Sequence, residues 1–205
     1  QVYKALSEIK FLSGKLENIP DEGTIAPASY DFVIGMTKEA LIKKMQERQA
    51  SILNEAWNAR QPNLPINTKQ EALILASIIE KETSLKTERG KVSSVFVNRL
   101  LREIALQTDA SVVYGITRGK KVLGRGLRRS ELKKDTPWNT YVNKGLPPSP
   151  IGNPGKASIH AALNPDITNY LYFVADGSGG HAFAENLREH NINVAKWRKI
   201  EKTDN

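Results

Sequence analysis

The sequence predicts an α+β protein that is rich in helices and carries one small antiparallel sheet. Three observations predict this class. Apolar residues recur at helical spacing in several segments, a pair of short β-type runs lies near the C-terminus, and a glycine-rich turn separates those runs. A series of helices followed by a hairpin is typical of α+β proteins, whereas a parallel sheet needs strands that alternate with helices.

Composition sets the first limits on function. The chain has 205 residues, of which 40% are hydrophobic and 25% charged, so it can bury a core of ordinary size. It contains no cysteine, which excludes a disulfide scaffold, a cysteine nucleophile and a thiolate metal site. Its 30 Lys and Arg against 22 Asp and Glu give a net charge of +8. This excess favours an anionic partner: nucleic acid, an anionic membrane surface or an acidic polymer.

The N-terminal part is predicted to be a subdomain of its own. A helix is expected from about Thr37 to Trp57, where apolar residues fall near helical spacing. Residues 58–67 contain two prolines and few apolar side chains, which is typical of a linker. We therefore place a domain boundary between residues 1–60 and residues 61–205.

The next segment carries the clearest helix signal. Thr68 and Glu71 have the spacing of a capping box, and the helix that they open is expected to run to about Leu85. Apolar residues occupy most of its circumference, which predicts a buried helix. Its longest apolar run, residues 72–79, is far shorter than the roughly 20 residues that span a bilayer.

Four further elements complete the prediction. A helix is expected from about residue 88 to residue 102, and a short helix over 110–115 with Asp109 as its N-cap. Asn153 and Pro154 have the residue types of an N-cap and a first helical position. The C-terminal part is expected to hold two strands, the turn between them and a last helix, at residues 170–175, 181–184, 176–180 and 191–199.

Two acids, Glu80 and Glu82, stand near the end of the apolar helix. A carboxyl in apolar surroundings has a raised pKa, so it can stay protonated near neutral pH and act as a general acid. The pattern alone favours a plainer alternative, in which one acid is paired and the other is solvated at the helix end. The cations available for such a pair are Lys81, Lys86 and Arg99.

Several motifs, in a fixed order, resemble one family of enzymes. They are Glu80-Lys81-Glu82-Thr83, Glu88-Arg89-Gly90-Lys91-Val92, Val95-Phe96-Val97-Asn98-Arg99-Leu100, Leu106-Gln107-Thr108-Asp109, Val113-Tyr114-Gly115, Asn139-Thr140-Tyr141, Gly145-Leu146-Pro147-Pro148 and Tyr170-Leu171-Tyr172-Phe173-Val174. This set resembles the endolytic murein transglycosylases of the MltG (YceG-like) family over about residues 68–197. Upstream, Glu22-Gly23-Thr24 is similar to a further family segment. Ala28 and Ser29 replace its Asp-Thr, so we predict no chemical role there.

The resemblance implies a helix-rich, lysozyme-like catalytic domain preceded by a partial LysM-like subdomain. The implied reaction cleaves the β-1,4 bond between N-acetylmuramic acid and N-acetylglucosamine within a glycan strand and leaves a 1,6-anhydro end. It needs one carboxyl, which acts first as acid and then as base, and no metal or cofactor. The implied setting is the bacterial inner membrane: a single-pass anchor outside this chain, this domain in the periplasm, and peptidoglycan synthases as partners.

The resemblance also implies roles for individual residues. Related enzymes often place the catalytic glutamate before Ser or Thr near the end of a buried helix, which favours Glu82 over Glu80. Five polar residues are expected to line a sugar-binding groove: Gln107, Thr108, Asp109, Asn139 and Tyr141. Three of them have structural alternatives, namely a helix cap for Asp109, a turn for Asn139 and the core edge for Tyr141.

Two competing functions stay open. Residues 118–134 hold eight Lys or Arg residues and one Glu, which favours nucleic-acid binding. The tract lacks interleaved aromatic residues and no nucleic-acid-binding motif is present, so an exposed loop is the favoured interpretation and we expect no nucleic-acid partner. The other competing function is a non-catalytic module that binds peptidoglycan.

Overall fold

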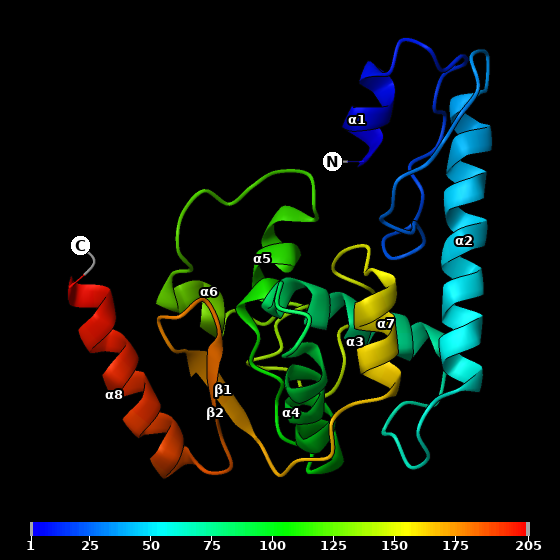
Figure 1. Ribbon diagram of the computed structural model, residues 1–205. Coiled ribbons are helices and arrows are strands. Elements are labelled where there is room, and N and C mark those ends of the chain that lie inside the picture. Colours follow the sequence, from blue (N-terminus) through cyan, green and yellow to red (C-terminus); the bar gives the residue numbers. More distant parts are fainter. Residues whose placement is uncertain (1, 204–205) are drawn as a thin grey trace.

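The computed structural model describes residues 2–203 and confirms the α+β class (Figure 1). The helices are α1 (Val2–Glu8), α2 (Lys38–Asn58), α3 (Lys69–Glu82), α4 (Arg89–Leu101), α5 (Asp109–Thr117), α6 (Arg129–Lys133), α7 (Lys156–Leu163) and α8 (Leu187–Thr203). Strands β1 (Tyr172–Ala175) and β2 (His181–Ala184) form an antiparallel hairpin in which Tyr172 lies opposite Ala184. No helix in this described part of the chain has the length and apolar character to cross a bilayer.

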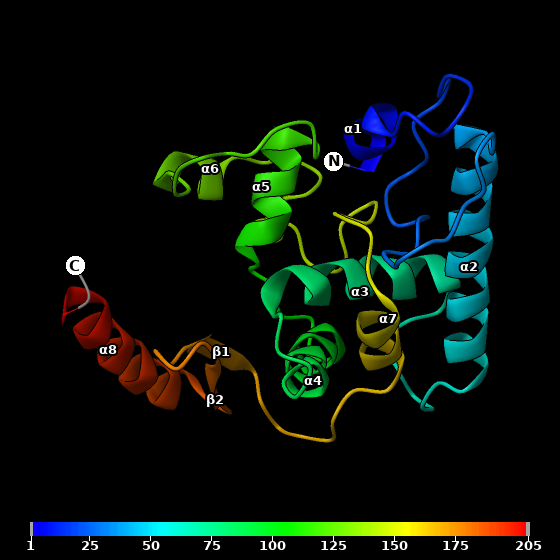
Figure 2. The ribbon, with the colours of Figure 1, turned by 45° about the horizontal axis from the view of Figure 1, so that its top comes forward.

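Helix α3 is the centre of the larger core. Thr68 accepts a hydrogen bond from the backbone N–H of Glu71, whose side chain returns one to Thr68, so the capping box is confirmed. Residues 72–79 are all buried, against side chains that include Phe96 of α4 and Ile159 of α7. Figure 2 shows α3 crossing the molecule between α2 and α5, with α4 and α7 packed along it. The helix ends at Glu82, three residues earlier than predicted, because the backbone turns extended at Thr83.

Two predicted N-cap residues are wrong, and α8 begins at Leu187, four residues earlier than predicted. Thr108, not Asp109, is the N-cap residue of α5, and Asp109 is its first helical residue. Helix α7 begins at Lys156 with Gly155 as N-cap, so Asn153 and Pro154 precede the helix. The Asn153 side chain instead accepts a hydrogen bond from the Ile25 backbone N–H, at 3.1 Å. A distant side chain, described below, supplies the α7 cap.

The N-terminal part has its own small hydrophobic cluster. Its buried members include Leu6, Leu12, Leu16, Ile25, Leu41 and Met45. The second half of α2 belongs to the larger core, where Ala56 is buried and Trp57 packs. The two clusters therefore meet within α2. Before α2, the described residues hold α1 and a single bridge between Ser13 and Thr37, which does not confirm the LysM-like fold.

Close packing joins the N-terminal part to the region around α3. Gly23 has φ +88°, and a Cβ at this position would lie 2.8 Å from Pro150 and 3.0 Å from Leu73. The buried Gln49 side chain of α2 donates hydrogen bonds to the carbonyls of Gly23 and Pro154, at 2.9 and 3.0 Å. We call this contact, made by Gly23, Gln49, Pro150 and Pro154, the seam. Only glycine fits at residue 23, since the space and the backbone conformation both exclude a side chain.

The basic tract forms an exposed loop followed by the short helix α6, which confirms the favoured interpretation. Arg118 lies 3.4 Å from the centre of the Trp138 ring, and Arg125 pairs with Glu131 at 2.6 Å. Six other cationic residues of the tract are exposed: Lys120, Lys121, Arg128, Arg129, Lys133 and Lys134.

Candidate active site

Glu82 is the last residue of α3 and is partly buried. Thr108 donates a hydrogen bond from its hydroxyl to Glu82 Oε1. Burial raises the pKa of Glu82 and is the largest influence on it; the charge of Asp109 raises it further, while the Thr108 hydrogen bond and His181 oppose the rise. The net pKa lies above its ordinary value, so Glu82 keeps its proton at a higher pH than a solvated glutamate does.

Thr108 is itself held by the segment around Thr140. Thr108 is only 3% exposed, and its backbone N–H donates to Thr140 Oγ1 at 3.1 Å. The neighbouring Gln107 N–H donates to the Thr140 carbonyl at 3.0 Å. Gln107 has φ +54°, a left-handed conformation that few residues other than glycine adopt. Such conformations persist where the surroundings fix them, often at functional sites.

Asp109 and Tyr141 form a second hydrogen-bonded pair beside Glu82. The Tyr141 hydroxyl donates to Asp109 Oδ1 at 2.7 Å. Burial raises the pKa of Tyr141 most, followed by the hydrogen bond and charge of Asp109 and then the charge of Glu82. Tyr141 therefore keeps its proton and stays a hydrogen-bond donor. Of the predicted site residues, the structure brings Thr108, Asp109 and Tyr141 together with Glu82.

Asn139 does not line a groove, in contrast to the expectation from sequence. It is 0% exposed, and its Nδ2 donates to the carbonyls of Glu131, Leu132 and Lys134 at 3.2, 3.0 and 2.8 Å. Its Oδ1 accepts from the Tyr141 N–H at 2.9 Å. The side chain thus has no polar atom free for a sugar, and the turn alternative describes it correctly. Its role is to hold the segment that carries Thr140 and Tyr141.

Glu80 has a structural partner of its own. Its Oε2 accepts from the Gly155 backbone N–H at 3.1 Å and from the Ser158 hydroxyl at 2.5 Å. This carboxylate therefore caps the N-terminus of α7, where the helix dipole favours negative charge.

The plainer alternative for the two acids, an ion pair with a nearby cation, does not hold within the described residues. Neither Glu80 nor Glu82 has a Lys or Arg nitrogen within ion-pair distance there. Arg99 is buried and donates to the carbonyls of Leu171, Ala105 and Leu106 and to Gln107 Oε1.

Comparison with known proteins places the chain in a family. The model of the YceG-like family matches residues 1–196. The chain belongs to the YceG-like family. It is 39% identical over 179 residues to an endolytic murein transglycosylase of Bacillus subtilis (strain 168), covering 87% of this chain and 48% of that protein. It is 34% identical over 182 residues to an endolytic murein transglycosylase of Streptococcus pneumoniae serotype 2, covering 85% of this chain and 32% of that protein.

A solved YceG-like structure has the same fold. The crystal structure of a YceG-like protein from Listeria monocytogenes superposes with a TM-score of 0.70 at 34% sequence identity. The match covers 83% of this chain and 54% of the Listeria chain. This YceG-like chain therefore spans about half of the Bacillus and Listeria proteins and about a third of the Streptococcus protein.

Two residues outside the predicted site set, His181 and Glu88, also bear on Glu82. The charge of His181 lowers the pKa of Glu82, and Glu88 binds His181. The available signal was the position of His181 directly after the glycine turn. Because the chain shows no metal-ligand spacing of histidines, the sequence favours a structural role for His181.

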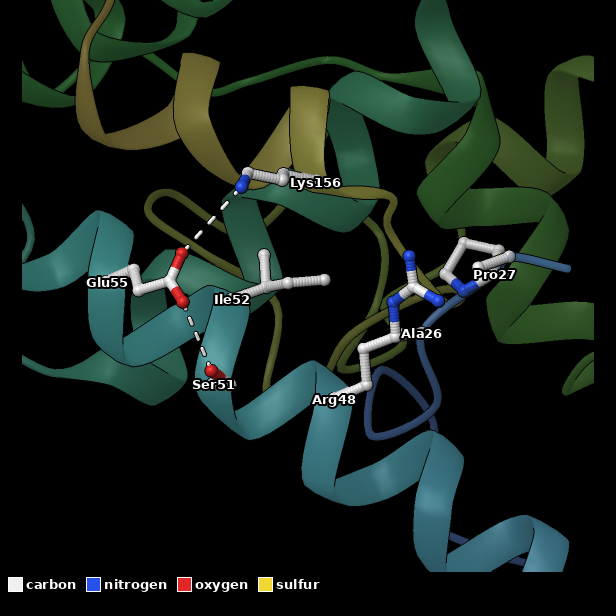
Figure 3. Close-up of a pocket in the computed structure, with 8 residues that line it drawn as sticks. Ala26, Pro27, Arg48, Ser51, Ile52, Glu55 and Lys156 are labelled. Atoms are coloured by element: carbon white, nitrogen blue, oxygen red, sulfur yellow. Dashed lines mark hydrogen bonds and ion pairs between the residues drawn. The ribbon is translucent and has the colours of Figure 1, made fainter. Parts of the chain in front are cut away.

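A pocket of about 270 Å³ lies away from Glu82, between α2, the segment after Gly23 and the start of α7 (Figure 3). Its lining residues are Ala26, Pro27, Ala28, Arg48, Ser51, Ile52, Glu55 and Lys156. Figure 3 shows the Glu55 carboxylate between Ser51 and Lys156, at 3.2 and 3.7 Å. None of the residues around Glu82 lines this pocket, so we assign it no part in the chemistry of Glu82.

The raised pKa of Glu82 predicts a pH-dependent stability difference. The folded chain holds this proton more tightly than the unfolded chain, whose value is about 4.5. The contribution of the group to stability is therefore fully present below that pH and is lost as pH rises through the raised pKa. The Glu82→Gln variant has no carboxyl here and does not lose this stability. We therefore expect the difference in Tm, variant minus unmodified chain, to increase from about pH 4 to neutral pH. Thermal unfolding of both proteins across that range is the measurement, and parallel curves would contradict the raised pKa.

Proposed function

We propose that this chain carries the catalytic site of an endolytic peptidoglycan lytic transglycosylase, with Glu82 as the acid and base. The observation that carries the proposal is the protonation-prone carboxyl of Glu82, held by Thr108 and flanked by Asp109 and Tyr141. Membership of the YceG-like family and relatives named endolytic murein transglycosylase support it.

The reaction needs a single carboxyl that changes its protonation state twice. Protonated Glu82 gives its proton to the oxygen that links C1 of N-acetylmuramic acid to N-acetylglucosamine, and the bond from C1 to that oxygen breaks. The Glu82 carboxylate then takes the proton of the muramic acid C6 hydroxyl, whose oxygen bonds to C1 and closes the 1,6-anhydro ring. No water is consumed, and Glu82 ends protonated. The second carboxylate of ordinary glycoside hydrolysis is unnecessary because the nucleophile belongs to the sugar.

Neighbouring residues fit supporting roles in this reaction. The Thr108 hydroxyl stabilises the Glu82 carboxylate that exists between the two steps, because it donates a hydrogen bond to it. The negative charge of Asp109 raises the pKa of Glu82 and favours the positive charge that develops at C1. Tyr141 holds Asp109 in place. The exposed Gln107 and Asp109 are the residues we assign to sugar binding.

Product analysis tests the proposal. The purified chain is incubated with peptidoglycan sacculi, and the released fragments are identified by mass spectrometry. We expect fragments with 1,6-anhydro-muramic acid ends, each one water lighter than the hydrolytic product. Fragments with reducing ends would instead show a hydrolase. Binding to sacculi with no release would support the non-catalytic module, and salt-sensitive binding to duplex DNA in its place would support a nucleic-acid partner.

The cellular setting is part of the proposal. Family resemblance supports a periplasmic site of action, attachment to the bacterial inner membrane by a segment outside this chain, and work beside peptidoglycan synthases on new glycan strands. The net charge of +8 fits an envelope with anionic lipid and peptidoglycan carboxylates. Two experiments test this setting. Fractionation of cells that express the whole protein tests its location, and cross-linking of that protein to peptidoglycan synthases tests its partners.

A further inference from the structure

The C-terminal hairpin contacts residues 83–88, the segment that follows Glu82 in the chain. Three residues after Glu82, a methyl carbon of Leu85 lies 3.4 Å from the position that a Cβ at Gly180 would take. Glu88 Oε1 lies 2.7 Å from that same position and accepts the backbone N–H of His181 at 2.9 Å. Because Gly180 has no side chain, the Glu88 carboxylate can occupy this space. These contacts hold the start of β2 close to the end of α3.

Glu88 also fixes the ring of His181. Its Oε2 lies 2.7 Å from His181 Nδ1, and the two side chains are only 17% (His181) and 15% (Glu88) exposed. The Phe173 ring meets the imidazole edge-on at 5.2 Å between ring centres. A carboxylate only accepts hydrogen bonds, so Nδ1 carries the hydrogen, and in the neutral ring Nε2 is left as an acceptor. Within residues 2–203, Nε2 has no hydrogen-bond partner.

The oriented ring belongs to the surroundings of Glu82. Arg99 donates hydrogen bonds to the carbonyl of Leu171, the residue before β1, and to Gln107 Oε1, next to Thr108. Together with the contact of Gly180 with Leu85, this ties the hairpin to the segments on both sides of Glu82. The charge of the protonated His181 ring also acts on the pKa of Glu82. Asp109 has a partner in Tyr141, whereas the outer nitrogen of His181 has none in the described chain. A fixed, unpaired acceptor next to the proton donor is suited to a ligand that carries hydrogen-bond donors.

We propose that His181 is a substrate-binding residue of the Glu82 site, whose Nε2 accepts a hydrogen bond from a hydroxyl or acetamido N–H of an N-acetylated sugar next to the scissile bond. Glu88 is the positioning residue that selects this form of the ring. The inference rests on the proposed function for the identity of the substrate, and on the Glu88–His181 geometry for the role of the residue.

Binding without turnover tests the proposal. In a Glu82→Gln background, binding of soluble, uncut glycan strands is measured with His181 and with His181→Phe, which keeps a ring against Phe173 but removes both nitrogens. We expect Kd to rise about three- to tenfold, the worth of one hydrogen bond. In the active chain, KM should rise by a similar factor. His160→Phe, at an exposed position on α7, is the matched control and should leave Kd and KM unchanged. An unchanged Kd for His181→Phe would overturn the proposal.

Glu88→Gln tests the positioning role while it keeps the shape of the side chain. Its amide oxygen still accepts the His181 backbone N–H, but its NH₂ donates to Nδ1, so the ring hydrogen moves to Nε2. We expect ¹⁵N spectra of the neutral ring to show the exchanged tautomer, and Kd to rise as it does for His181→Phe. A changed tautomer with an unchanged Kd would overturn the role of Glu88. If the unmodified chain bound glycan but released no anhydro product, the proposed function would fail while this binding comparison still decided the role of His181.

Discussion

Glu82→Gln is expected to lower the release of anhydro-ended fragments by about 10²- to 10⁴-fold, the range for loss of a general acid or base. The effect should fall at the upper end, because the same carboxyl serves in both proton transfers. A glutamine amide neither gives the first proton nor takes the second. The measurement is the initial rate of fragment release from a soluble glycan, followed by chromatography.

Glu80→Gln is the matched control, since it makes the same chemical change two residues away. Its amide oxygen still accepts from Gly155 and Ser158, so the α7 cap is weakened rather than lost. We expect fragment release near that of the unmodified chain and a loss of about 1 kcal/mol of stability. An inactive Glu80→Gln together with an active Glu82→Gln would exchange the roles of the two acids.

Asn139→Asp should be the most destabilising of these substitutions, although it changes few atoms. It replaces the NH₂ that donates to three carbonyls with an oxygen that repels them. A buried charge that keeps only the Tyr141 N–H as a donor, together with the lost hydrogen bonds to the carbonyls, is expected to cost about 3 kcal/mol or more. Urea unfolding gives the free energy, and Asn191→Asp on the exposed surface of α8 is the control, with a change within about 0.5 kcal/mol. Similar losses in both variants would contradict the role of Asn139.

The sequence could predict what depends on neighbours along the chain. The capping box at Thr68, the buried face of α3 and the hairpin after Tyr170 each follow from residues a few positions apart. The choice of Glu82 has another origin and stays a prediction: it rests on the resemblance to enzymes that place the catalytic glutamate before Ser or Thr near the end of a buried helix.

The errors come from contacts between distant segments. Asn153 and Pro154 have suitable residue types for a helix start, but Glu80 supplies the cap from a helix about 75 positions earlier, so α7 starts later. Asn139 is a polar residue inside a motif, and only the fold shows that three carbonyls surround its amide. The pairing of His181 with Glu88 is likewise not visible in the sequence, because the two residues are 93 positions apart.

Helix α2 gives the molecule a mechanical connection between its two parts. Its 21 residues form a rod about 30 Å long, with one half in the small cluster and the other in the larger core. A tilt of about 10° about one end would move the other end by about 5 Å. Gln49, near the middle of the rod, is held at the seam by the carbonyls of Gly23 and Pro154. The seam therefore fixes the middle of this rod to the segment that leads into α7, the helix that Glu80 ties to α3.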